Sequence, residues 1–128
     1  MVKPKSIAKL KREVQTLFNA FIRRRDILMG HTFICISCGK EKDISFMNAG
    51  HLFSIKGYDH LRYNEDNCNG ECSGCNGFNK NHQIWYSINL QKKIGEERWN
   101  ALLNDAVSKP EKGWTREQLV LLLKKYKR

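Results

Sequence analysis

Two pairs of cysteines constrain this 128-residue chain more than any other feature of its sequence. Cys35 and Cys38 form one C-x-x-C pair, Cys72 and Cys75 form the other, and a glycine beside each pair permits a tight turn. Two thiolates from one such turn can bind one ion, and two turns complete a tetrahedron. The spacing therefore predicts a closed structural zinc site, in preference to four unrelated buried thiols.

The fifth cysteine, Cys68, lies outside both pairs and is predicted to be a free thiol. The first residues lack the apolar core of a secretion signal, and no stretch approaches the roughly 20 apolar residues of a membrane span. We therefore expect a cytoplasmic protein with no membrane partner. Thiols stay reduced in that compartment, which favours metal binding over disulfide bonds.

Positive charge is concentrated at the two ends of the chain. The 23 Lys and Arg residues outnumber the 13 Asp and Glu residues, which gives a formal charge of +10. Residues 1–28 carry eight basic and two acidic side chains, residues 116–128 carry five and one, and the middle is neutral. Basic ends favour binding to a polyanion such as DNA, with Arg23, Arg24 and Arg25 as candidate contacts. The alternative is that these side chains form solvated helix faces and complement a helix dipole.

Hydrophobic spacing predicts a mixed α+β chain with helices at both ends. A long first helix is expected to begin after Ser6 and to end at Met29-Gly30. Further predicted elements are a strand at 32–36, short strands within 40–67, a helical pattern from 76 that breaks at Gly95, a helix that ends near 109–110 and a last helix capped by Thr115. The expected core contacts after the second cysteine pair are Ile84, Trp85, Ile88 and Leu90.

The two cysteine pairs are separated by 33 residues, whereas a simple zinc ribbon has roughly 15–20 residues there. The extra length predicts a structured insertion. Polar groups suited to metal binding and proton transfer lie inside it and after it, namely His51, His60, Asn64, Asn67, Asn76 and His82.

These residues carry a resemblance to known nucleases. A first C-x-x-C, a histidine on the following hairpin, an asparagine five residues before a second C-x-x-C and a helix starting there are similar to the HNH, or ββα-metal, nucleases. The chain more closely resembles the NinG/Rap family of lambdoid phages, recombination proteins that cleave branched DNA, over about residues 33–126. The matching segments are Cys35-Ile36-Ser37-Cys38-Gly39, Ala49-Gly50-His51, His60-Leu61-Arg62-Tyr63-Asn64 and Cys72-Ser73-Gly74-Cys75-Asn76.

The resemblance implies a small α+β fold in which a zinc-fastened ββα-metal core carries the site. The expected division is a basic N-terminal helix at 1–30 and an HNH-like nuclease domain with C-terminal helices at 31–128. A phage protein of this kind would work in the cytoplasm of the bacterial host cell.

The resemblance also implies roles for particular residues. His51 matches the histidine that activates the attacking water, and a neutral imidazole suits that task. Asn67 matches the asparagine that holds the loop under this histidine, and His60 is a further candidate catalytic residue. Asn76 and His82 are the expected ligands of a catalytic metal, and Arg62 is a candidate phosphate contact.

The chain departs from the HNH pattern at Gly50. Many HNH enzymes have an aspartate there that binds the catalytic metal, and glycine cannot supply one. The sequence leaves four substitutes open, which are His60, His82, Asp59 and Glu71.

The leading interpretation is a metal-dependent endonuclease that hydrolyses phosphodiester bonds in branched DNA or recombination intermediates, with structural zinc and catalytic Mg²⁺. The main alternative is a zinc-stabilised DNA-binding module in recombination without catalysis, which Gly50 favours. A zinc-organised protein-interaction adaptor is a third alternative. Symmetric cutting of a junction would favour a homodimer as partner, although no self-complementary surface is visible in the sequence.

Overall fold

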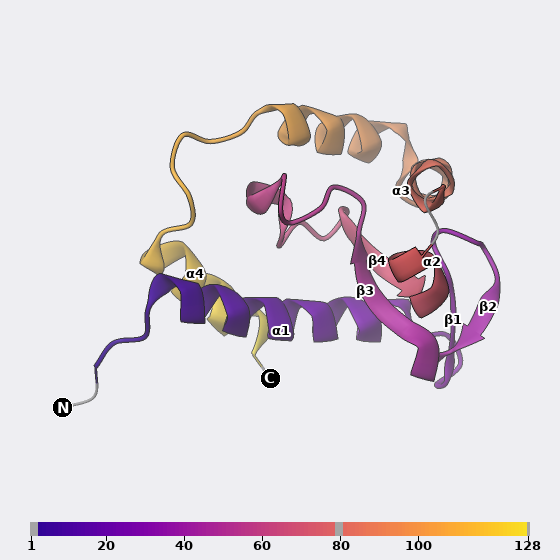
Figure 1. Cartoon of the computed structure of the whole chain (residues 1–128), viewed down its shortest axis with the longest axis horizontal. Coiled ribbons are helices and arrows are strands. Elements are labelled where there is room, and N and C mark those ends of the chain that lie inside the picture. The colour runs from indigo at the N-terminus through magenta and orange to yellow at the C-terminus, as the bar shows by residue number, and fades with distance from the viewer. Residues whose placement is uncertain (1–2, 79–80, 128) are drawn as a thin grey trace.

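The computed structural model describes residues 3–78 and 81–127. It is a small mixed α+β fold in which a long helix, α1, lies on one side of a two-stranded hairpin and a second long helix, α3, lies on the other (Figure 1). The elements are α1 (Ile7–Asp26), β1 (Thr32–Ile34), β2 (Glu41–Asp43), η1 (Ile44–Phe46), β3 (Met47–His51), η2 (Asp59–Leu61), β4 (Cys68–Cys72), α2 (Ser73–Phe78), α3 (His82–Val107) and α4 (Arg116–Tyr126).

Helix α1 begins as the sequence predicts, because the Ser6 side chain accepts a hydrogen bond from the amide of Lys9 at 3.1 Å. It ends at Asp26, earlier than the predicted Met29-Gly30. The chain turns extended at residue 27, and the amide of Leu28 donates to the carbonyl of Thr32 at 2.7 Å. Met29 and Gly30 have positive φ values of 48° and 86°, so they form the tip of a turn into β1.

The strands form two separate antiparallel pairs. Strand β1 pairs with β2, and the first cysteine pair lies in the connection between them. Strand β3 pairs with β4 in a register that places Gly50 opposite Asn69 and His51 opposite Cys68. Helix α2 follows β4 without a linker, so the second cysteine pair spans the junction of strand and helix.

Helix α3 contains the break that Gly95 predicts, since this residue has a φ of 85° in the middle of the helix. The expected core contacts Ile84, Trp85 and Ile88 are wrong, because their side chains are 60%, 56% and 37% exposed. Before the break, the buried residues of α3 are Tyr86 and Leu90, which lie one helical turn apart on one face; after it, Leu102 and Ala106 are buried.

Helix α4 begins with the predicted cap, in which Thr115 and Gln118 bond each other's backbone in a capping box. It packs on α1, and the two helices share a core with β4 and the loop that joins β3 to β4. This core is made of Leu10, Val14, Phe18, Ile22, Tyr63, Cys68, Leu119 and Tyr126. The proposed division at residue 30 stays a prediction. Within the described residues, no helix is long and apolar enough to cross a membrane.

Candidate functional site

The four predicted zinc ligands come together in the structure. The sulfur atoms of Cys35, Cys38, Cys72 and Cys75 all lie within 4.8 Å of one another, and Cys38 Sγ is 4.0 Å from Cys72 Sγ. Zinc–sulfur bonds of about 2.3 Å in a tetrahedron place the sulfurs about 3.8 Å apart. The cluster therefore has the donors and the spacing to hold one structural metal ion such as zinc.

Local hydrogen bonds build the cluster from the strand ends. Gly39 has a φ of 73° and donates its amide to the carbonyl of Cys35 at 2.9 Å, which closes the first turn. The amides of Cys38 and Cys72 both point at Cys35 Sγ, at 3.4 and 3.3 Å. Burial alone would raise the pKa of the Cys72 thiol, but donors that include the amide of Cys75 lower it below its ordinary value. These N–H groups favour the thiolate form that a metal binds.

Cys68 lies outside the cluster, as predicted. It is fully buried on β4, and burial raises the pKa of its thiol to about 12, so the sulfur stays protonated. Its Sγ lies 3.8 Å from Nδ1 of His51. The free thiol therefore forms part of the surroundings of the predicted general base.

His51 is the last residue of β3, and its half-buried ring lies beside Phe18 of α1. Its Nε2 is 3.0 Å from the carbonyl oxygen of Arg62, so Nε2 carries the hydrogen and donates it. Nδ1 is then the unprotonated nitrogen. Burial lowers the pKa of His51 below 6.5, because an apolar environment disfavours the imidazolium ion. The ring is therefore neutral at physiological pH.

Asn67 is fully buried directly before β4 and ties down the loop that follows His51. Its Oδ1 accepts from the amide of Phe53 at 2.9 Å. Its Nδ2 donates to the carbonyls of Phe53 at 3.0 Å and Leu61 at 3.2 Å. The loop that Asn67 holds runs on to Arg62, whose carbonyl holds His51. The geometry agrees with the loop-holding role expected for Asn67, and its part in catalysis stays a prediction.

On the other face of the hairpin lies a buried carboxylate, Glu71. Its Oε2 accepts a hydrogen bond from Ser37 Oγ and lies 3.1 Å from Nδ1 of His82 at the start of α3. Burial raises the pKa of Glu71, and the neighbouring Ser37 and His82 partly offset this. Among the four substitutes for the carboxylate missing at Gly50, Glu71 and His82 are thus in direct contact.

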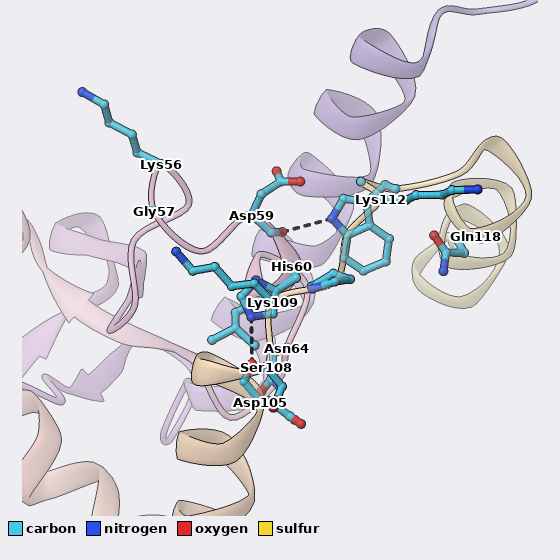
Figure 2. Close-up of a pocket in the computed structure, with 14 residues that line it drawn as sticks. Lys56, Gly57, Asp59, His60, Asn64, Asp105, Ser108, Lys109, Lys112 and Gln118 are labelled. Atoms are coloured by element: carbon cyan, nitrogen blue, oxygen red, sulfur yellow. Dashed lines mark hydrogen bonds between the residues drawn. The ribbon is translucent and has the colours of Figure 1, made fainter.

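The other two substitutes lie elsewhere. Nε2 of His60 is 2.8 Å from the carbonyl of Asp105, and Asp59 pairs with Lys11 and Arg62, each at 2.9 Å. Figure 2 shows His60 and Asp59 at a pocket of about 530 Å³ that lysines also line. In the described part of the chain, neither residue forms a hydrogen bond or ion pair with Glu71 or His82. Asn76, the remaining predicted ligand, is exposed on α2 one residue after the zinc cluster.

The predicted DNA-binding arginines differ in their surroundings. Arg25 donates to the carbonyls of Glu65 at 2.7 Å and Cys68 at 2.9 Å, so it ties α1 to the hairpin. Arg62 donates to Gln15 and Asp59, at 2.9 Å each. Arg23 is half-buried and Arg24 is exposed.

The two basic ends of the sequence meet in the fold. Arg24 and Arg25 of α1 line one shallow depression together with Lys125 and Lys127 at the end of α4. Four basic side chains from the two ends of the chain therefore form one local basic surface, which the sequence did not show. DNA binding there stays a prediction.

Comparison with known proteins identifies relatives. A family model described as "Bacteriophage Lambda NinG protein" matches residues 1–128. Protein ninG of Escherichia phage lambda is 34% identical over 86 residues, which cover 67% of this chain and 40% of that protein. Protein ninG of Escherichia phage 933W is 33% identical over 86 residues (67% and 40%), and that of Salmonella phage P22 is 32% identical over 84 residues (66% and 39%). The match thus spans about two fifths of these relatives. No solved structure matches the chain significantly.

Proposed function

This chain belongs to the NinG family of phage proteins, and we propose that it is a metal-dependent endonuclease that hydrolyses phosphodiester bonds in branched DNA or recombination intermediates. The observation that carries the proposal is the state of His51. Its imidazole is neutral, its Nε2–H is fixed on the carbonyl of Arg62, and its unprotonated Nδ1 lies 3.8 Å from the thiol of Cys68.

The order of elements supports a likeness to the ββα-metal nucleases. Strands β3 and β4 form a hairpin, α2 follows at the second cysteine pair, and His51 ends the first strand. Asn67 lies in the connection and holds the loop that carries Arg62. This arrangement is the one that the sequence resemblance implies, and we propose that the core is HNH-like.

In the proposed reaction, Nδ1 of His51 takes a proton from the water that attacks phosphorus. The imidazolium that forms keeps its Nε2–H on the Arg62 carbonyl, and this polar contact offsets part of its charge. A divalent ion, when bound, would stabilise charge on the phosphate and on the leaving oxygen. The resemblance assigns His82 and Asn76 to that ion; Asn76 is exposed on α2, and His82 contacts the buried Glu71.

The second candidate function is a DNA-binding module without catalysis. The basic surface of Arg24, Lys125 and Lys127 serves either function, since both require contact with phosphate. Gly50 favours the module, because this position offers no carboxylate to a metal.

The test is incubation of the zinc-loaded protein with four-way junction, duplex and single-stranded DNA, in Mg²⁺ and in chelator. His51→Ala and His51→Gln should each lose about 10²–10⁴-fold of the single-turnover cleavage rate, while zinc content and DNA affinity are kept. The matched control is His31→Ala, because His31 is exposed and lies in the turn before β1. Wild-type protein that binds a junction but never cuts it, with Mg²⁺ or Mn²⁺, would support the binding module.

A further inference from the structure

Glu71 presents an unusual state for a buried carboxylate. Its side chain is 0% exposed, and one oxygen, Oε2, is in contact with Ser37 and His82. The other oxygen, Oε1, is the only buried side-chain oxygen or nitrogen without a hydrogen-bond partner in the part of the chain that the structure describes. A buried polar group without a partner costs free energy, and such groups in native proteins point to a missing ion or water or to a catalytic role.

The carboxylate lies against Gly50 of the neighbouring strand. A Cβ atom built at position 50 would overlap with Glu71 Oε1 and lie 3.2 Å from Glu71 Cδ. Strand alternation explains this contact, because residues 50 and 71 both point toward α3, whereas His51 points toward α1. Glu71 therefore places its carboxylate where the side chain of a larger residue 50 would be.

We propose that Glu71 and His82 together form the divalent-cation site of this protein, with Glu71 supplying from β4 the carboxylate that position 50 lacks. The assignment rests on the proposed endonuclease function and deepens it. A carboxylate oxygen and an imidazole nitrogen are donors that suit Mn²⁺ and, through oxygen, Mg²⁺.

The distance between the two donor groups fits this use. Glu71 Oε2 and His82 Nδ1 are 3.1 Å apart and form a hydrogen bond, which an ion bound to both groups would replace. Adjacent ligands on an octahedral ion with bonds of about 2.1 Å are about 3.0 Å apart. His82 is 20% exposed and lines a cavity of about 390 Å³, so an ion has a route to the pair from that side. Ser37 holds Glu71 in place from the first cysteine turn.

The competing explanation is purely structural, since Ser37, Glu71 and His82 also tie the first cysteine turn and β4 to α3. A measurement of Mn²⁺ binding separates the two explanations. The signal of free Mn²⁺ in electron paramagnetic resonance decreases as the protein binds the ion. Zinc-loaded wild type is compared with Glu71→Gln, which keeps the shape and the hydrogen-bonding capacity but removes the charge. Glu41→Gln is the matched control, because Glu41 is an exposed carboxylate on β2.

The ion-site proposal expects Glu71→Gln to weaken Mn²⁺ binding by at least the roughly 10–100-fold that an outer-shell partner costs. A double variant, Glu71→Ala with Gly50→Asp, moves the carboxylate back to β3 and should recover most of the affinity. Gly50→Asp alone should lower the melting temperature, because its side chain overlaps with Glu71. Circular dichroism and zinc content establish that each variant is folded.

Unchanged Mn²⁺ affinity in folded Glu71→Gln would overturn the proposal and leave the structural tie. The outcomes also separate this inference from the proposed function. Wild type that binds Mn²⁺ through Glu71 but cuts no DNA would refute the endonuclease and keep the ion site. A nuclease whose Mn²⁺ dependence is the same in wild type and Glu71→Gln would refute the ion site and keep the endonuclease.

Discussion

Removing one thiolate from the cysteine cluster should unfold or strongly destabilise this protein, whereas removing the fifth thiol should not. The comparison uses Cys38→Ala and Cys68→Ala. The side chain of Cys38 is exposed and that of Cys68 is fully buried. Burial alone therefore ranks Cys68→Ala as the more damaging change, at about 1 kcal/mol for a group the size of one methylene. Metal binding predicts the opposite order.

The magnitude follows from the energy of the metal site. Structural zinc binding contributes about 10–16 kcal/mol of apparent free energy in small zinc domains, and one of four ligands accounts for about 2.5–4 kcal/mol of it. A domain of this size is stable by about 5–15 kcal/mol, and 1 kcal/mol shifts its melting temperature by about 4 °C. Cys38→Ala should therefore lower the melting temperature by about 10 °C or more, and Cys68→Ala by about 4 °C.

The assay is thermal unfolding by circular dichroism, combined with metal content by mass spectrometry on protein purified without chelator. Wild type and Cys68→Ala should carry one zinc per chain, and Cys38→Ala should carry less. The reasoning would be refuted if Cys38→Ala kept one zinc and melted near wild type, or if Cys68→Ala lost its zinc.

Three further predictions concern proton transfer, DNA contact and the stability that Arg25 provides. The cleavage rate should rise with pH and reach half of its plateau below pH 6.5, the ordinary imidazole pKa, because only neutral His51 accepts the proton and burial lowers its pKa; a rate profile that still rises well above pH 7 would indicate a different base. Arg24→Ala should leave the melting temperature unchanged but weaken DNA binding and reduce its salt slope by about 1, as titrations at several salt concentrations would measure. Arg25→Ala should lower the free energy of unfolding by roughly 1.5–3 kcal/mol, because it removes charged donors from the carbonyls of Glu65 and Cys68. Equal melting temperatures of the Arg24→Ala and Arg25→Ala variants would contradict this prediction.

Features set by neighbouring residues could be predicted from the sequence. The Ser6 and Thr115 caps, the break at Gly95 and the cysteine cluster all follow from short patterns whose physical cause is local or, for the cluster, from one ion that requires four thiolates. The cluster also contained an unused signal. Ser37 lies inside the first cysteine pair, and Glu71 directly precedes the second pair. Because both pairs would bind one ion, they must bring Ser37 and Glu71 together.

Features that depend on contacts between distant elements could not be predicted in this way. The buried face of α3 was misassigned, because helical spacing alone does not say which of two apolar faces meets the hairpin, and Tyr86 is buried where Trp85 is not. The run of arginines shows no difference in sequence between Arg24 and Arg25. Only the packing of α1 against β4 shows that Arg25 bonds backbone carbonyls while Arg24 faces outward.

The register of the β3–β4 hairpin determines where the candidate catalytic groups lie, and the cysteine cluster holds one end of this hairpin. Side chains alternate along a strand, so a shift of one residue would exchange the faces on which His51 and Glu71 lie. Cys72 ends β4 opposite Met47, and its sulfur belongs to the metal cluster. A bound ion would fix that end of the strand and hold His51 toward α1 and Glu71 toward His82. A structural metal ion would therefore control the proposed reaction without taking part in it. Loss of the cysteine cluster would displace both His51 and Glu71, even in a molecule that kept its helices.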